Sequence, residues 1–365
     1  MNLARPSNEG LFRGIAIALM LLFPVVYFAS ALFGATPSPI QPKPRWTQLF
    51  VLTVSEWPAV SFSEPSGLSR FAGQSGSIDQ LYAPSLNPVS SAASLWTGRF
   101  QSRFQSGQSD RAAFKGLPPN SWTLVESLRA SGARTAAFLQ EPLISQSGIE
   151  GFESVTEAPT LDLEAMTTLV VERLKETSNK RNCIWLHVTQ PTIVQLSTLA
   201  TNLRAVAHNA GIGHESLIVI TGFGTPKSLT LDGQSRAPLH MIIPGGTAAG
   251  LKGSGAASVV DLAGTLQSLL KLPPPIAPQK PLHSRGEHLW RLLNGGSGYQ
   301  WLFIGGEYGD VLRFGRTRVA PNAIGQLVAE QTDDPRSDAG FHPAPKPLQA
   351  EMIGQYRQLV QLLAD

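Results

Sequence analysis

The chain has 365 residues, a formal net charge of +3, 42% hydrophobic residues and only 15% charged residues. The apolar content excludes a disordered tail, and the sequence has no run of four or more Lys or Arg residues that would indicate a nucleic-acid partner. A single cysteine, Cys183, excludes an intrachain disulfide framework and a paired-cysteine metal site.

The first segment with a clear pattern is the uncharged stretch at residues 14–35. At 1.5 Å per residue a helix of this length extends about 33 Å, which is enough to cross the hydrocarbon core of a bilayer. We therefore expect a transmembrane helix that contacts the lipid bilayer. A short cytoplasmic N-terminus at residues 1–13 precedes it, and an extended, proline-rich linker at residues 36–45 follows it.

The charges beside this segment indicate its orientation. Arg5 and Arg13 precede it with Glu9 between them, and Lys43 and Arg45 follow, so the charges on the two sides are nearly balanced; applying the positive-inside rule, we expect the N-terminus in the cytoplasm. The bulk of the chain is then expected on the periplasmic side of a bacterial inner membrane, held by a single pass. A cleaved signal peptide is the alternative, because Ala-Ser-Ala at residues 29–31 offers a small-residue cleavage site.

The body of the chain, residues 46–320, alternates short apolar runs with amphipathic stretches. This alternation predicts an α/β fold in which a mainly parallel sheet is sandwiched by helices. The expected strands are residues 49–54, 133–139, 183–188, 217–221 and 238–243, with a late hairpin at 301–304 and 311–314. The expected helices are residues 122–131, 163–176, 196–207 and 257–272. Residues 321–365 are expected to form a C-terminal loop and an amphipathic helix at 346–364.

Six blocks of sequence resemble the sulfatases, which belong to the alkaline-phosphatase-like superfamily. SSAASLWTGRF at residues 90–100 resembles the family signature that begins with a Cys or Ser nucleophile and ends in Thr-Gly-Arg. The other blocks follow in the family's order: TLVESLRASGARTAAF (123–138), IWLHVTQPT (184–192), LIVITGFGT (217–225), KSLTLDGQSRAPLHMIIPG (227–245) and SVVDLAGTLQSLLKLPPP (258–275). The resemblance covers residues 46–320 and implies a sulfatase-like fold.

The chemistry of that family is metal-assisted hydrolysis, in which Asp, Asn and His side chains hold a divalent cation beside the nucleophile. In this chain Pro88 stands at the nucleophile position and Gly222-Phe223 at the position of an Asp-His pair. The positions that remain as relics of the family's cleft are Ser55, Glu56, Pro88, Ala92, His187, Thr192, Gly222, Phe223 and Lys227. We therefore expect no catalytic residue, no metal and no cofactor.

A few of the remaining side chains admit a functional interpretation. Ser90 or Ser91 could replace the nucleophile, but a serine in a helix-initiating loop is the simpler interpretation. Lys227 and Arg236 could bind an anion. His187 lies on an apolar strand, where a hydrogen-bonded core histidine is more common than a metal ligand.

These observations leave three hypotheses for function. The first is a non-catalytic, membrane-anchored sulfatase-like domain that serves as an extrinsic structural or accessory subunit, with integral membrane proteins of a larger complex, such as a respiratory or photosynthetic one, as its partners. The second is a sulfate- or phosphate-ester hydrolase at the membrane with a rearranged site. The third is an anion- or glycan-binding module that uses Lys227 and Arg236.

Overall fold

The chain divides into two compact units, Met1–Pro42 and Lys43–Asp365. The structure, a computed structural model, describes residues 46–57, 71, 73–100, 114, 116–118, 121–177, 180–211, 213–224, 234–246, 248–253, 255–273, 288–296, 302–304, 311–314, 316–322, 324, 326–332 and 341–364. Within these ranges no helix is both long and apolar enough to span a membrane. The expected transmembrane helix at residues 14–35 and the linker at 36–45 lie outside the described residues.

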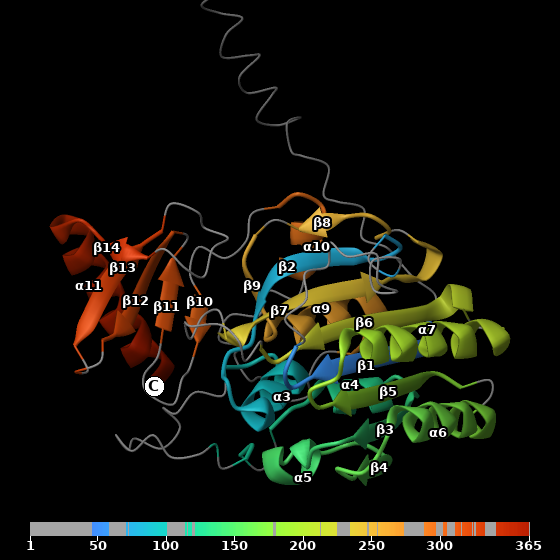
Figure 1. The fold of residues 1–365 in the computed structure, drawn as a ribbon. Coiled ribbons are helices and arrows are strands. Elements are labelled where there is room, and N and C mark those ends of the chain that lie inside the picture. Colours follow the sequence, from blue (N-terminus) through green and yellow to red (C-terminus); the bar gives the residue numbers. More distant parts are fainter. Residues whose placement is uncertain are drawn as a thin grey trace, which may run out of the picture. The chain divides into compact units, whose positions relative to one another are not determined.

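A nine-stranded sheet forms the centre of the second unit (Figure 1), in the order β4-β3-β5-β1-β6-β7-β2-β8, with β9 also paired to β2. Strand β7 is antiparallel to β6 and to β2, whereas the other pairings are parallel. Its strands are β1 (Gln48–Val54), β2 (Gly76–Tyr82), β3 (Arg134–Leu139), β4 (Ser154–Glu157), β5 (Asn182–Val188), β6 (Ser216–Gly222), β7 (Arg236–Ile242), β8 (Lys252–Gly253) and β9 (Ala257–Ser258). The expected mainly parallel α/β sheet is confirmed.

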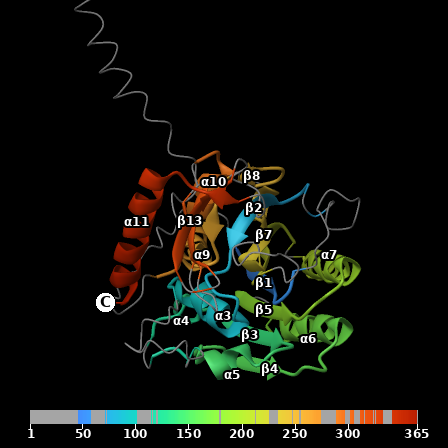
Figure 2. The same ribbon diagram turned by 60° about the vertical axis from the view of Figure 1, so that its left-hand side comes forward.

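Helices cover both faces of this sheet (Figure 2). One face packs on α6 (Leu163–Glu176) and α7 (Ile193–Asn209), whose apolar side chains join those of β1, β5 and β6 in one core cluster. The other face carries a larger cluster beneath α3 (Pro88–Thr97), α4 (Leu124–Ala130), α5 (Leu143–Ser147), α9 (Asp261–Leu270) and α10 (His288–Leu293). Two short 3₁₀ turns, η2 (Gly213–Glu215) and η3 (Pro244–Gly246), complete this part of the fold.

A second, antiparallel sheet follows the first, with strands in sequential order. It comprises β10 (Leu302–Ile304), β11 (Val311–Phe314), β12 (Thr317–Pro321), β13 (Leu327–Gln331) and β14 (His342–Pro343), and α11 (Lys346–Ala364) packs on β13. The expected hairpin is confirmed by the pairing of β10 with β11. The expected loop after residue 320 is wrong, because residues 327–331 pair along the whole of β12 and extend the sheet.

The two sheets meet at a buried arginine. Arg313, on β11, is 3% exposed, and its Nη1 donates to the hydroxyl of Tyr82 at the end of β2 over 3.0 Å. The guanidinium carbon also lies 5.6 Å from the centre of the Tyr82 ring. This contact and the apolar side chains around it join the small sheet to the large one.

Candidate functional site

The parallel strands of the large sheet bring their carboxyl ends to one edge. β1, β5 and β6 are paired in register, so Val54, Val188 and Gly222 lie side by side. The backbone N–H of Ser55 donates to the Val188 carbonyl over 3.1 Å, and that of Phe223 donates to the Val54 carbonyl over 2.8 Å. The edge therefore holds Ser55, His187 and Phe223 together, at the place where open α/β sheets carry their ligands.

Three polar atoms from neighbouring strands form a triangle at this edge. Ser55 Oγ donates to Glu141 Oε2 over 2.5 Å and lies 2.9 Å from Nε2 of His187. The third side, from His187 Nε2 to Glu141 Oε2, measures 3.0 Å. Ser55 follows β1, Glu141 follows β3 and His187 lies in β5 between them. We call these three residues the strand-end triangle.

The protons of this network have a consistent arrangement when Glu141 is ionised. The indole N–H of Trp185 can only donate, and it donates to Thr53 Oγ1 over 2.9 Å. Nε2 of His187 lies 3.0 Å from the ionised Glu141 carboxylate, so the proton of the neutral ring is on Nε2. Nδ1 then accepts from the Thr53 hydroxyl over 2.8 Å. Ser55 also donates to Glu141, so each side chain of this network, from Trp185 to Ser55, has a hydrogen-bond partner.

The charge state of the triangle follows from burial and hydrogen bonding. Burial disfavours the charged imidazole and lowers the pKa of His187, although the nearby Glu141 carboxylate partly opposes this effect. Burial alone would raise the pKa of Glu141, but the hydrogen bonds from His187 and Ser55 outweigh it and lower that pKa. The triangle therefore carries one negative charge, on a side chain that is 27% exposed.

The Phe223 ring fills the space beside the triangle, and the neighbours of Gly222 are close-packed around it. The Phe223 ring stacks on the His187 ring, with centroids 5.7 Å apart and planes inclined by 20°. A β-carbon at Gly222 would lie 3.0 Å from Ala237 Cβ and 3.0 Å from Cε3 of Trp57. Both residues sit where the resemblance implies a metal-binding Asp-His pair, and here both are packed as parts of the core.

The other relic positions have structural contacts of their own. Pro88 occupies the first turn of α3, where Asn87 caps the helix by accepting from the backbone N–H groups of residues 89 and 90. Ala92 is fully buried in the same helix. Thr192 caps α7 through a reciprocal hydrogen-bond pair with Gln195, so it acts in helix initiation.

The serines and charged residues that the sequence suggested as functional groups also have structural roles of their own. Ser91 is buried and donates to the Ser85 carbonyl over 2.7 Å, and Ser90 is buried in the same helix. Glu56 accepts from Gln190 Nε2 over 2.9 Å. Arg236 Nε donates to the Asp79 carbonyl over 3.0 Å. Lys227 lies outside the described residues.

Sequence reasoning missed Glu141, Gln140 and Thr53. It expected Glu56 to be the single carboxylate of the cleft, whereas Glu141 is the carboxylate that contacts Ser55 and His187. The available signal was topological, because Glu141 comes two residues after an expected strand, and the carboxyl ends of parallel strands share one edge. Gln140, beside it, accepts from the Thr189 backbone N–H over 2.7 Å and so ties β3 to the loop after β5.

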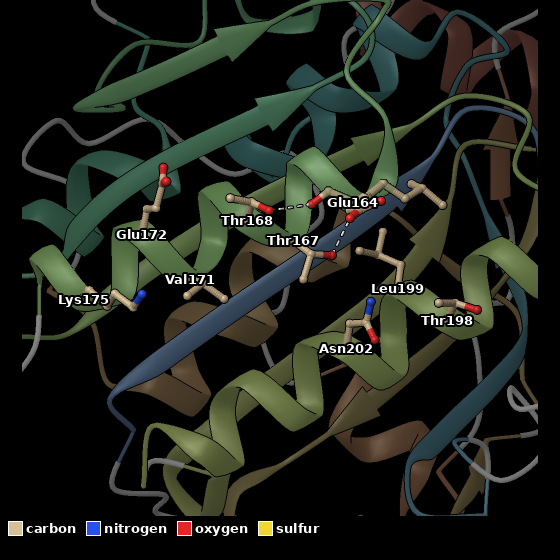
Figure 3. Close-up of a pocket in the computed structure, with 10 residues that line it drawn as sticks. Glu164, Thr167, Thr168, Val171, Glu172, Lys175, Thr198, Leu199 and Asn202 are labelled. Atoms are coloured by element: carbon tan, nitrogen blue, oxygen red, sulfur yellow. Dashed lines mark hydrogen bonds between the residues drawn. The ribbon is translucent and has the colours of Figure 1, made fainter.

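The described residues contain no group of three or more His, Cys, Asp or Glu side chains that could hold a metal ion. A pocket lies elsewhere, on the outer surface of α6 and α7 (Figure 3). This groove of about 610 Å³ is lined by Leu163, Glu164, Thr167, Thr168, Val171, Glu172, Lys175, Thr198, Leu199 and Asn202. It includes no residue of the strand-end triangle.

Comparison with known proteins identifies the fold. No protein-family model matches the chain, and no curated protein matches it in sequence. A phosphonate monoester hydrolase of Agrobacterium radiobacter is similar in structure, with a TM-score of 0.64, 14% identity, and 87% of this chain and 95% of that chain covered. A putative sulfatase from Bacteroides thetaiotaomicron gives a TM-score of 0.65 at 13% identity, with 88% and 92% covered.

A protein of the alkaline phosphatase superfamily from Vibrio parahaemolyticus gives a TM-score of 0.60 at 13% identity, with 89% of each chain covered. Together these likenesses show that the chain has the fold of the sulfatases and of the alkaline phosphatase superfamily. The fold that the six sequence blocks implied is confirmed.

Proposed function

We propose that this chain is a non-catalytic, membrane-anchored domain of sulfatase fold that serves as an extrinsic structural or accessory subunit of a membrane protein complex. The fold supports the scaffold part of this proposal, because it is the fold of known sulfatases and phosphonate hydrolases. We infer the subunit role from the expected absence of the family's ligands in the cleft, because the function of a fold resides in its sites, and a domain without a catalytic site keeps its surface for contacts.

The observation that carries the proposal is the packing at Gly222. The first carbon of a side chain at this position would lie 3.0 Å from Ala237 Cβ and from Trp57 Cε3, so these neighbours would have to shift by a few tenths of an ångström. Contacts this close in a packed core force neighbouring atoms to move, so a metal-binding carboxylate does not fit at the end of β6 without rearrangement.

The charge at the triangle supports the same conclusion. Glu141 stands near the end of β3, and its lowered pKa keeps it negatively charged near neutral pH. A sulfate or phosphate ester is an anion, so a carboxylate at this edge repels the substrate that the sulfatase chemistry requires. Arg236, which the sequence suggested as an anion-binding residue, donates a hydrogen bond from Nε to the Asp79 backbone carbonyl.

One observation favours a second candidate function, a hydrolase with a rearranged site. Ser55 Oγ lies 2.9 Å from His187 Nε2, which is the distance expected between a nucleophile and its general base. In the proton arrangement described above, however, Nε2 carries the proton and Ser55 donates to Glu141. His187 must therefore change tautomer before it can accept the Ser55 proton.

The subunit role is tested on the full chain in its native membrane. Membranes are solubilised in a mild detergent, the chain is purified by a C-terminal tag, and the integral membrane proteins that elute with it are identified. Each candidate partner is then tagged in turn. We expect reciprocal recovery at a fixed stoichiometry, and elution of the chain alone, at the size of one copy in a micelle, would contradict the proposal.

A further inference from the structure

The groove on the outer surface of α6 and α7 lies apart from the strand-end triangle (Figure 3). We propose that this groove is the interface of a homodimer, in which a second copy of the chain docks across a twofold axis with its α6 antiparallel to the α6 of the first. The four helices would then form a bundle whose core is the groove of both copies. The inference goes beyond the subunit role and does not rest on it.

The outer face of α6 has a charge at each end and uncharged side chains between them. Glu164, Thr168, Val171 and Lys175 line the groove at spacings of four, three and four residues, which places them in one stripe along the helix. Glu164 lies in the first turn and Lys175 in the last, and both are exposed. Glu172, which is also exposed, is directed away from α7 and lies beside the stripe (Figure 3).

This stripe is complementary to its own copy. When two α6 helices lie antiparallel about a twofold axis at the middle of the stripe, Glu164 of each copy faces Lys175 of the other. Thr168 then faces Val171 of the second copy near the axis. Packed helices lie about 8–10 Å apart, depending on the side chains at the contact, and threonine and valine are small enough for a close approach.

The α7 wall of the groove adds apolar surface to this interface. Val194, Thr198 and Asn202 are spaced by four residues and form one row along α7, and the last two of them line the groove. Val194 extends this row and is 69% exposed. Exposed ion pairs contribute little affinity but fix the register of a complex. Burial of Val194 and of the half-buried Val171 would supply the driving force for association.

The test measures the oligomeric state of the full-length chain in detergent by sedimentation velocity at several protein concentrations. We expect a reversible equilibrium between monomer and dimer that shifts to monomer as salt is added, because salt screens exposed ion pairs. Lys175→Glu places two carboxylates opposite each other at both ends of the interface. It should raise the dissociation constant of the dimer about tenfold or more.

The double variant Glu164→Lys/Lys175→Glu separates an interface from a role within the helix. It restores opposite charges across the twofold axis, so the dimer should return. Within a single helix the same exchange opposes the helix dipole at both ends, so a purely intrahelical role predicts no recovery. The matched control is Glu351→Lys, which reverses an exposed glutamate of α11 and should leave the dissociation constant unchanged.

Three results would overturn the proposal: a chain that stays monomeric, a dissociation constant that Lys175→Glu does not change, or a double variant that dimerises no better than Lys175→Glu. If the charge variants do not fold, Thr168→Cys decides, because the native Cys183 is buried. A short bifunctional maleimide should join two copies of Thr168→Cys and no copies of Glu351→Cys.

The same cross-linking in native membranes identifies the occupant of the groove. A covalent dimer supports the proposal, whereas cross-links from Thr168→Cys to a different protein alone would make that protein the occupant and overturn it. Failure here leaves the subunit role standing, since that role is judged by the recovery of integral membrane proteins and not by the number of copies of this chain.

Discussion

At the residue scale, Gly222 shows how tightly the end of β6 is packed. Its missing side chain leaves room for the Trp57 ring and for Ala237, and neither can retreat easily because both are buried. We predict that Gly222→Ala lowers the free energy of unfolding by about 1–3 kcal/mol through overpacking.

A second glycine provides the control for that measurement by urea denaturation. Gly354 lies within α11, and a β-carbon there meets no atom within 4 Å. Gly354→Ala should raise the free energy of unfolding by about 0.5–1 kcal/mol, because alanine is the better helix former. Equal effects of the two substitutions would contradict the packing argument at Gly222.

His240 gives a prediction for the pH dependence of stability. Burial in β7 lowers its pKa from 6.5 to about 4, with Ser75 Oγ 3.3 Å from Nδ1 and the Phe71 ring edge-on. The His240 ring therefore gains its proton near pH 6.5 in the unfolded chain but only near pH 4 in the folded chain. Stability contributed by the neutral ring should be lost as the pH falls through this window, by about 3 kcal/mol.

The measurement compares urea denaturation of the unmodified chain with that of His240→Asn at several pH values between 4 and 7. Asparagine cannot gain a proton, so the variant should show a smaller loss of stability across the window. Parallel pH profiles for the two proteins would show that His240 is not the group responsible.

At the scale of single elements, Thr192 tests whether a relic position has taken on a structural role. Thr192 caps α7, its hydroxyl accepting from the Gln195 backbone N–H at 3.2 Å. Thr192→His removes the capping hydroxyl, and it should cost about 1 kcal/mol of stability through loss of the cap. Thr192→Ser keeps the capping hydroxyl and should remain within about 0.5 kcal/mol of the unmodified chain. If both variants are equally stable, the cap contributes nothing.

The elements predicted from sequence are those with strong local patterns. β1, β5 and β6 are continuous apolar runs, and the structure buries every residue of each. β2, with the sequence GSIDQLY, carries polar residues and lacks such a run, and it becomes a strand by pairing with β7. β12 (TRVAP) and β13 (LVAEQ) are short, mutually paired strands whose buried side chains pack with those of α11, so their burial pattern is set by tertiary contact.

The candidate site could be predicted only in part, because its residues are brought together by tertiary contacts and not by a local pattern. The departures from the sulfatase pattern that the resemblance implies can be read residue by residue, as at Pro88 and Phe223. The partnership of Ser55, Glu141 and His187 joins residues far apart in the chain, and only the strand order β3-β5-β1 brings them together. A strand order is a property of the whole sheet, which spacing along the sequence does not encode.

At the scale of the whole molecule, the division after Pro42 leads to a prediction about attachment. We expect residues 43–365 to fold when produced alone, because both core clusters of the large sheet and the small sheet lie entirely within them. The full chain should stay with membranes after a high-salt wash, whereas residues 43–365 should be found in the soluble fraction. N-terminal sequencing of the native protein that begins near residue 32 would show a cleaved signal peptide instead.

The central claim, that a sulfatase fold has lost its chemistry, is tested most directly by assaying the purified full chain against an aryl sulfate and an aryl phosphate. The assay is run with added Ca²⁺, Mg²⁺, Mn²⁺ or Zn²⁺, beside Ser55→Ala and Glu141→Gln as matched variants. We predict that all three proteins give the rate of the metal-containing buffer alone, because Pro88 offers no nucleophile and Glu141 repels the anionic substrates. Metal-dependent turnover by the unmodified chain that disappears in either variant would contradict the claim.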